Sequence, residues 1–233
     1  MKLINIFMKI AGKKDFYIDE KVSKIYIIRL CVEYGLMLIR GCGFSLFYKN
    51  ISSKVFIGNK VKLYEKRNMT IGKNVKIRNN VKIDALSTDG VVLGDNVVLG
   101  KASIIECTGS IRNLGKGIRI GEGSTFGNDC FFGAAGGISI GTNVIAGQYI
   151  RFHSENHNYS DLNKLIKDQG VSHKGIKVGN NCWIGSGAVF LDGAEIGDGC
   201  VVAANSVVTK QFPSNSIIGG VPAKIIKMRN ANE

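Results

Sequence analysis

The sequence predicts an all-β chain whose main part is a parallel β-helix of about seven triangular coils. Three observations lead to this fold class. An aliphatic residue recurs every six residues over most of the chain, and glycine often follows it directly. The fifth residue of these hexads is small in one turn after another. The 233 residues also include 30 glycines, about twice the usual share, without a Gly-X-Y period or a Gly/Ser linker.

The composition is that of a globular chain with a sizeable core. Because 45% of the residues are hydrophobic, a wholly disordered chain is excluded. The six cysteines form neither a Cys-x-x-Cys pair nor a zinc-like spacing. We therefore expect reduced thiols, no metal and a cytoplasmic protein, with the inner face of the membrane as an open alternative.

Residues 1–52 are expected to form a basic amphipathic helical segment. Residues 1–67 hold 14 Lys and Arg against 5 Asp and Glu, and so carry +9 of the formal net charge of +13. The apolar stretch 22–47 includes four charged residues, which argues against a membrane span. Two interpretations stay open: the helix packs on its own chain or a sister subunit, or it lies on an anionic membrane surface. No recognition motif accompanies the charge, so no nucleic-acid partner is expected.

Residues 53–212 are predicted to form the β-helix. The first hexads of successive turns open at Ile57, Ile71, Leu93, Ile120, Ile140, Val178 and Ile196. Their fifth positions are Val61, Val75, Val97, Ser124, Val144, Cys182 and Cys200. Three short strands per turn make a triangular prism with the aliphatic residue inside and the small residue at the corner. Glycine is expected to permit corner conformations that a Cβ would penalise. Cys130, Cys182 and Cys200 all fill fifth positions and are therefore interpreted as packing residues.

Residues 153–177 interrupt the repeat with a polar insertion. This inserted loop holds all three histidines, His153, His157 and His173. Loops that project from a rigid scaffold often carry function, and imidazole can act as a base near neutral pH. At least one of these histidines is therefore expected to be catalytic. The remaining residues, 213–233, are predicted to be a C-terminal tail with a short helix.

Several segments together resemble one family. They are the hexads, the loop segment ENHNYSD, the block WIGSGAVFLDGAEIG and the ending VVTKQFPSNSIIGGVPAKIIKMR. These are similar to the left-handed β-helix hexapeptide-repeat acyltransferases, and most of all to the sugar and polysaccharide O-acetyltransferases related to the maltose and galactoside acetyltransferases. The resemblance covers about residues 55–229. It implies a left-handed coil, acetyl-CoA as the acyl donor, and a homotrimer whose active sites lie between adjacent prisms.

The resemblance also assigns roles to residues. His157 matches the general base, His153 is a reserve candidate, and His173 is expected to be structural. A backbone N–H of Gly185 or Ser186 is expected to stabilise the oxyanion. Lys224 and Lys227 match positions that meet the nucleotide phosphates of coenzyme A. The full set expected to bind coenzyme A is Gly185, Ser186, Ala204, Thr209, Lys210, Lys224 and Lys227.

The acceptor cannot be carried over from the resemblance. Gly127 and Ala135 stand where the maltose-type enzymes place an Asn and an Asp for the sugar. The expected activity is O-acetylation of a sugar hydroxyl in a surface polysaccharide (capsule, O-antigen or exopolysaccharide) or in its lipid-linked or nucleotide-linked precursor. The alternatives are N-acetylation of a nucleotide-linked amino sugar, a metal-dependent hydratase with three histidines on an interfacial zinc, and a non-catalytic β-helix scaffold.

Overall fold

The computed structural model describes residues 18, 19 and 21–230. The chain divides into two compact units, Met1–Leu36 and Met37–Glu233, with the boundary inside helix α2, Lys24–Ser45. The Ser23 hydroxyl accepts the N–H of Tyr26 at the start of this helix. Within the described part of the chain, every helix is too short or too polar to cross a membrane. The segment boundary expected after residue 52 stays a prediction.

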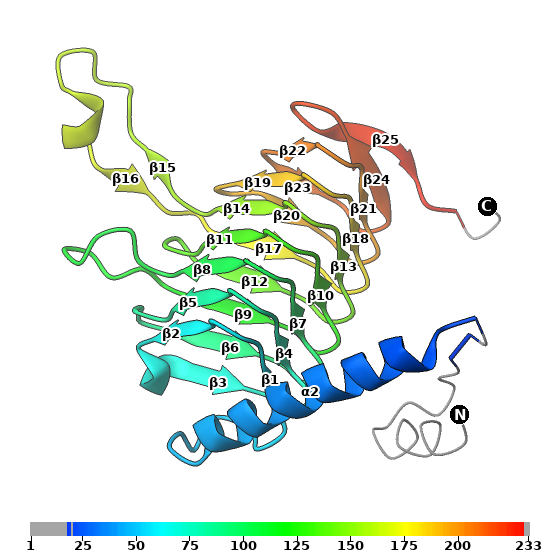
Figure 1. Cartoon of the computed structure of the whole chain (residues 1–233). Coiled ribbons are helices and arrows are strands. Elements are labelled where there is room, and N and C mark those ends of the chain that lie inside the picture. Colours follow the sequence, from blue (N-terminus) through cyan, green and yellow to red (C-terminus); the bar gives the residue numbers. More distant parts are fainter. Residues whose placement is uncertain (1–17, 20, 231–233) are drawn as a thin grey trace. The chain divides into compact units, whose positions relative to one another are not determined.

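The second unit contains a parallel β-helix with three flat faces (Figure 1), as the sequence predicts. Face A consists of β3 Met69–Ile71, β6 Val91–Leu93, β9 Ile118–Ile120, β12 Ile138–Ile140, β17 Ile176–Val178, β20 Glu195–Ile196 and β23 Gln211–Phe212. Face B consists of β1 Phe56–Ile57, β4 Lys76–Ile77, β7 Val98–Leu99, β10 Thr125–Phe126, β13 Ile145–Ala146, β18 Trp183–Ile184, β21 Val201–Val202, β24 Ser216–Gly219 and β25 Lys224–Met228. Face C consists of β2 Lys62–Tyr64, β5 Lys82–Asp84, β8 Ile104–Glu106, β11 Phe131–Gly133, β14 Arg151–His153, β19 Val189–Leu191 and β22 Val207–Val208.

Each coil passes from face A to face B to face C and back, and we name its AB, BC and CA corners after the faces they join. The AB and BC corners are turns of three or four residues. The CA corner accepts insertions, at 85–90, 107–117 and 154–175. The longest of these carries the antiparallel hairpin of β15, Asn156–His157, and β16, Val171–Ser172. The longer connecting segments therefore lie on one edge of the prism.

The interior is filled by the side chain that points inward from each short strand. Phe132, Phe152 and Phe190 lie at the middle of successive face C strands and are fully buried. The ring of Phe152 stacks on Phe132 at 5.2 Å and on Phe190 at 4.8 Å between centroids. Cys182 and Cys200 are buried one above the other in adjacent coils. The two coils are joined there by the hydrogen bond that Trp183 N–H donates to Cys200 O. Burial raises the pKa of the Cys130 thiol, which fits its expected packing role.

Second-position glycines are required by the distance between coils and not by their conformational freedom. A Cβ on Gly141 would lie 2.7 Å from the carbonyl carbon of Gly179 in the next coil. The left-handed backbone falls two positions later in the hexad, at Asn143 (φ 56°) and Gly199 (φ 69°). Asn and Gly adopt this conformation most readily. The corner conformation expected of glycine is therefore found at the fourth position of the hexad and not at the second.

The first turn of the expected frame is also wrong. Ile57 lies on face B and pairs with Ile77, whereas Ile71 lies on face A and pairs with Leu93. Val61 accordingly does not share the column of small residues. Hexads look alike on every face, so the period alone cannot tell on which face the chain enters the prism.

The inserted loop is shorter than the sequence suggests. His153 ends β14 in register with Gly133 and Leu191, and Ile176–Val178 form β17. The insertion is therefore 154–175, and His153 belongs to the coil. A polar residue is acceptable there because it points outward, next to the inward Phe152.

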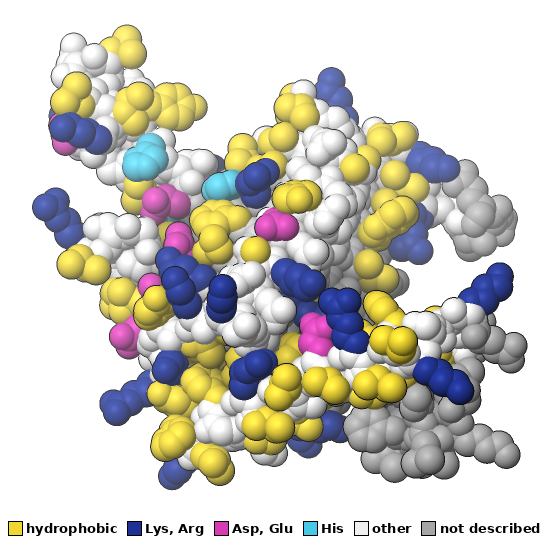
Figure 2. Space-filling view, in the orientation of Figure 1, with side chains coloured by type: hydrophobic (Ala, Val, Ile, Leu, Met, Phe, Trp, Pro, Cys, Tyr) yellow, Lys and Arg dark blue, Asp and Glu magenta, His cyan; other side chains and the backbone are white. Residues whose placement is uncertain are grey.

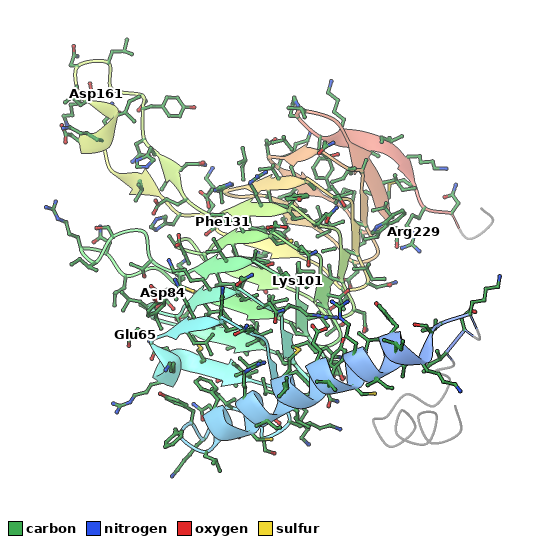
Figure 3. The ribbon with its side chains drawn as sticks, viewed as in Figure 1. Glu65, Asp84, Lys101, Phe131, Asp161 and Arg229 are labelled. Carbon is green, nitrogen blue, oxygen red and sulfur yellow. The ribbon has the colours of Figure 1, made fainter. Side chains whose placement is uncertain are left out.

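The C-terminal tail contains no helix among its described residues, 213–230, so the expected short helix is wrong. Instead β25 runs antiparallel to β24. The β-branched pair Ile225–Ile226 favours a strand, and β25 pairs the last face B strand instead of leaving its edge open. Arg229 then donates to Gly199 O at 2.6 Å and fastens the end of β25 to an AB corner (Figure 3).

Candidate active site

A groove crosses face B at the last coils. It is lined by Gly147, Trp183–Ser186 and Val201–Ala204, and we call it the face B groove. Three of the residues expected to bind coenzyme A line it: Gly185, Ser186 and Ala204. Its walls are backbone and uncharged side chains, with the indole of Trp183 60% exposed. An extended apolar chain can lie along such a surface.

The two expected oxyanion donors in this groove differ in whether their N–H is already used. The N–H of Gly185 donates to Val202 O at 2.8 Å within the strand ladder, so it cannot also serve an oxyanion. The Ser186 N–H donates to no other group in the described residues. Of the two expected oxyanion donors, Ser186 is therefore the one that remains available.

The tail lysines lie on a strand beside this groove. Lys224 pairs with Gly219 and Lys227 with Ile217 across the β24–β25 ladder. The Ile226 side chain reaches the space above Gly219, where the Ala203 methyl group also lies. Both lysines are exposed. The structure thus brings two cations to the same face as the groove, as phosphate binding would require.

Thr209 and Lys210 lie elsewhere. They form the CA corner between β22 and β23, while Ser186 and Ala204 lie at BC corners. The Lys210 ammonium lies 5.6 Å from the centre of the Phe212 ring. Two corners of a triangular prism face different directions, so one chain does not gather all seven expected residues into one site.

His157 lies on the projecting hairpin. It is exposed and pairs with Val171 in the ladder between β15 and β16. The hairpin extends outward from the CA corner, away from the face B strands (Figure 1), and Asp161 lies near its tip (Figure 3). Within one chain, the expected base and the face B groove are therefore separate.

The base of the hairpin is held by a charge-assisted contact. His173 Nε2 and Glu155 Oε2 are 2.7 Å apart, one residue beyond the Asn156–Ser172 pair. This contact fits the expected structural role of His173. The Glu155 carboxylate therefore already has a hydrogen-bond partner in His173. The Asp161 carboxylate accepts the N–H of Asn163 near the tip of the hairpin.

His153 has a different environment from His157. Its ring lies 5.4 Å from the Phe131 ring on the outside of face C. Burial, together with the charge of Arg151, lowers the pKa of His153. Within the described residues, no three His, Cys, Asp or Glu side chains of one chain gather closely enough to hold a metal ion.

Sequence reasoning missed Trp183. It is the chain's single tryptophan, and it lies at an outward position of β18, where its large apolar side chain stays mostly exposed to solvent. A large aromatic residue at an outward position of the repeat was the signal that sequence reasoning could have used. The two positions that differ from the maltose-type pattern are also separated, with Gly127 at a BC corner and Ala135 at a CA corner.

Comparisons with known proteins find a hexapeptide-repeat pattern and acetyltransferase relatives. The pattern described as bacterial transferase hexapeptide (six repeats) matches residues 175–210. The chain is 36% identical to a galactoside O-acetyltransferase of Escherichia coli over 93 residues, 40% of this chain and 45% of that protein. It is 49% identical over 55 residues to the Escherichia coli protein named "Putative lipopolysaccharide biosynthesis O-acetyl transferase WbbJ", covering 24% of this chain and 28% of that one. The aligned part therefore spans less than half the length of either relative.

A solved structure extends the likeness over more of the chain. The maltose O-acetyltransferase of Clostridium difficile is 27% identical, with a TM-score of 0.50, over 72% of this chain and 76% of that one. The resemblance to hexapeptide-repeat acyltransferases is thereby confirmed.

Proposed function

We propose that this hexapeptide-repeat protein is an acetyl-CoA-dependent O-acetyltransferase that acts on a sugar hydroxyl of a surface polysaccharide or of its precursor. The observation that carries the proposal is the face B groove, where Ser186 offers a free N–H among small residues beside two exposed lysines. The likeness to galactoside and maltose O-acetyltransferases supports the reaction class. The likeness to the protein named for lipopolysaccharide biosynthesis supports the choice of acceptor.

The proposed reaction is a direct acetyl transfer. The His157 imidazole takes the proton of the sugar hydroxyl while the hydroxyl oxygen attacks the thioester carbon. The oxyanion that forms accepts a hydrogen bond from Ser186 N–H. The C–S bond then breaks, and the coenzyme A sulfur takes the proton from the imidazolium. The products are an acetyl ester and a free thiol.

Acetyl-CoA occupies the face B groove in this proposal. Its pantetheine arm lies along Gly185, Ser186 and Ala204, and its phosphates meet Lys224 and Lys227. The exposed indole of Trp183 adds a flat apolar surface for the arm. Acetyl-CoA is a substrate here, and no metal takes part in the proposed steps.

A homotrimer completes the proposed site. The hairpin and Thr209–Lys210 belong to the CA corner, whereas the groove belongs to face B and the BC corner. If the CA corner of one prism lies against the BC corner of the next, His157 of one copy reaches the groove of its neighbour. Three copies related by a three-fold axis close this arrangement into a ring.

Mixing two inactive variants tests the shared site. His157→Ala removes the base, and Ala204→Trp fills the groove from an exposed position. Each variant alone is expected to be inactive. Because a mixed trimer pairs the intact hairpin of one copy with the intact groove of another, equimolar co-expression should restore about a quarter of wild-type activity if copies mix randomly. A mixture as inactive as its components would contradict the shared site.

The linkage formed by the enzyme tests the reaction class. Purified protein is incubated with acetyl-CoA and surface glycan, and the glycan is followed by mass spectrometry for added acetyl groups. Loss of the added group in mild alkali indicates an ester, and its persistence indicates an amide. An alkali-stable product would replace O-acetylation with the N-acetylation alternative.

We also infer that helix α2 lies on an anionic membrane surface. Four aliphatic side chains on one side of the helix are exposed: Ile25, Ile28, Val32 and Leu36. Figure 2 shows apolar side chains along this helix. Lys21, Lys24 and Arg29 lie in the same stretch and suit anionic headgroups.

Charged substitutions on this stripe test the membrane proposal. Ile25→Glu/Ile28→Glu/Val32→Glu should weaken co-sedimentation with vesicles of phosphatidylglycerol by about tenfold or more, because charge and lost apolar area both oppose insertion. Leu162→Glu, at a fully exposed aliphatic residue of the hairpin, is the control and should bind like wild type. Equal binding by the triple variant and wild type would refute the membrane contact.

A further inference from the structure

A second groove lies at the CA corner, apart from the face B groove. It is formed by four successive coils, where segments 89–92, 116–119, 136–139 and 174–177 pass from the corner onto face A. We call it the CA groove. It lies on the edge of the prism that accepts insertions, and its last segment is the returning limb of the His157 hairpin.

The CA groove is lined by four cationic side chains. Lys116 and Arg119 come from one coil, and Lys174 and Lys177 come from the coil two positions further along. Lys177 makes an ion pair with Glu195 at 3.4 Å. The other three make no ion pair with any described residue, and Asp89 is the acid in the lining. Counting Asp89, Glu195 and the buried Asp192, whose carboxylate accepts the N–H groups of Lys174 and Gly175, against the four cations leaves one positive charge.

The groove floor is backbone. Gly117 has φ +117° and Gly137 has φ +97°, and neither has a side chain to fill the space. The stem of Lys116 lies against Gly137, where an added Cβ would be 3.3 Å from the lysine Cδ. The N–H groups of Gly117 and Gly137 both donate to Ala134 O. An anion in this groove would therefore be held by the side-chain cations and not by backbone donors.

The spacing of the cations suits two linked anionic groups better than one. Strands β9, β12 and β17 are neighbours on face A. Two inter-strand spacings, about 10 Å, therefore separate the Lys116–Arg119 pair from the Lys174–Lys177 pair, with an uncharged coil between. A single carboxylate cannot meet both pairs. A diphosphate, with oxygens at both ends, can meet long side chains that converge from the two sides.

The groove is tied to the hairpin that carries the proposed base. Buried Asp192 accepts the N–H groups of Lys174 and Gly175 at 2.7–3.0 Å and fixes the returning limb. Gly136 N–H donates to the Ser154 hydroxyl, where the outgoing limb leaves the coil. Both limbs are therefore anchored at the groove, and a ligand held there lies at the root of the hairpin.

We propose that the CA groove binds the diphosphate that carries the acceptor sugar, so that acetylation takes place before the glycan leaves its diphosphate carrier. This inference rests on the proposed function, which it deepens by naming the acceptor class. The shared chemistry is a sugar diphosphate, whether its other end is a nucleoside or a polyprenyl lipid.

Binding of inorganic pyrophosphate tests the groove directly. Calorimetric titrations use full-length protein saturated with coenzyme A, so that the donor phosphate site is already filled. Lys116→Gln/Arg119→Gln should weaken pyrophosphate binding by about tenfold or more, because two of the four groove cations are lost. The control is Lys62→Gln/Lys73→Gln, which removes two exposed cations outside the groove and should bind like wild type.

Acetyl transfer in the same variants separates this inference from the proposed function. The groove variant should raise KM for a diphosphate-linked sugar by about tenfold while its affinity for acetyl-CoA stays unchanged. A UDP-sugar and a polyprenyl-diphosphate sugar in phosphatidylcholine vesicles, assayed side by side, identify the carrier. Pyrophosphate affinity equal to wild type, or an equal loss in the control, would refute the groove. A parallel loss of acetyl-CoA affinity would reassign it to the donor, whereas wild-type protein that binds no acetyl-CoA would refute the proposed function itself.

Discussion

Replacing His157 with alanine is expected to lower kcat for acetyl transfer by about 10²–10⁴-fold, the usual contribution of a positioned general base. A sugar hydroxyl keeps its proton at neutral pH, so without the imidazole the attacking oxygen is a poor nucleophile. The side chain is exposed on β15, so the free energy of unfolding should change by less than about 0.5 kcal/mol. Release of the coenzyme A thiol measures the rate.

His173→Ala is the matched control for this experiment. It removes the contact with Glu155 and loosens the base of the hairpin, but it leaves the proposed base in place. We expect a loss in kcat of less than about tenfold, as for a residue that positions another. Affinity for acetyl-CoA should stay unchanged in both variants, because the face B groove is untouched. Full activity in His157→Ala, or equal losses in the two variants, would show that His157 is not the base.

The coil itself could be predicted from the sequence because its repeat is local. Each hexad specifies an inward aliphatic residue and a small corner residue, and Cys182 and Cys200 stack as that period requires. The period does not specify the face, so the turn opening at Ile57 was misplaced. It also treats an outward polar residue as an interruption, so His153 was assigned to the loop although it ends β14.

The site was only partly predictable, for a different reason. The resemblance assigned Ser186 and Ala204 to coenzyme A binding, and both line the face B groove. Contacts between segments far apart in the chain have no local signal. The strand β25 depends on the open edge of β24, and the CA groove depends on four corners that the sequence separates by up to 88 residues, from Asp89 to Lys177.

Replacing Phe152 with alanine is expected to lower the free energy of unfolding by about 3–5 kcal/mol, the range for a large aromatic residue removed from a packed core. The ring is fully buried and stacks between Phe132 and Phe190 from the coils on either side. Alanine leaves a cavity in the centre of this column. The neighbouring coils cannot close it, because their spacing is set by the ladder hydrogen bonds of all three faces. Urea denaturation at one fixed protein concentration measures the change.

Phe131→Ala tests whether the inward position, and not the loss of a phenyl ring, causes the effect. Phe131 precedes Phe132 on β11, points outward, and lies only half-buried against the His153 ring. Its removal takes away apolar contact without opening an enclosed cavity, so the loss should be about 1 kcal/mol. If both variants lost the same free energy, the phenylalanine column would not be the centre of the core. A solenoid coil interacts mainly with its two neighbours. In Phe152→Ala, the coils on the two sides of the weakened coil should therefore unfold independently of each other.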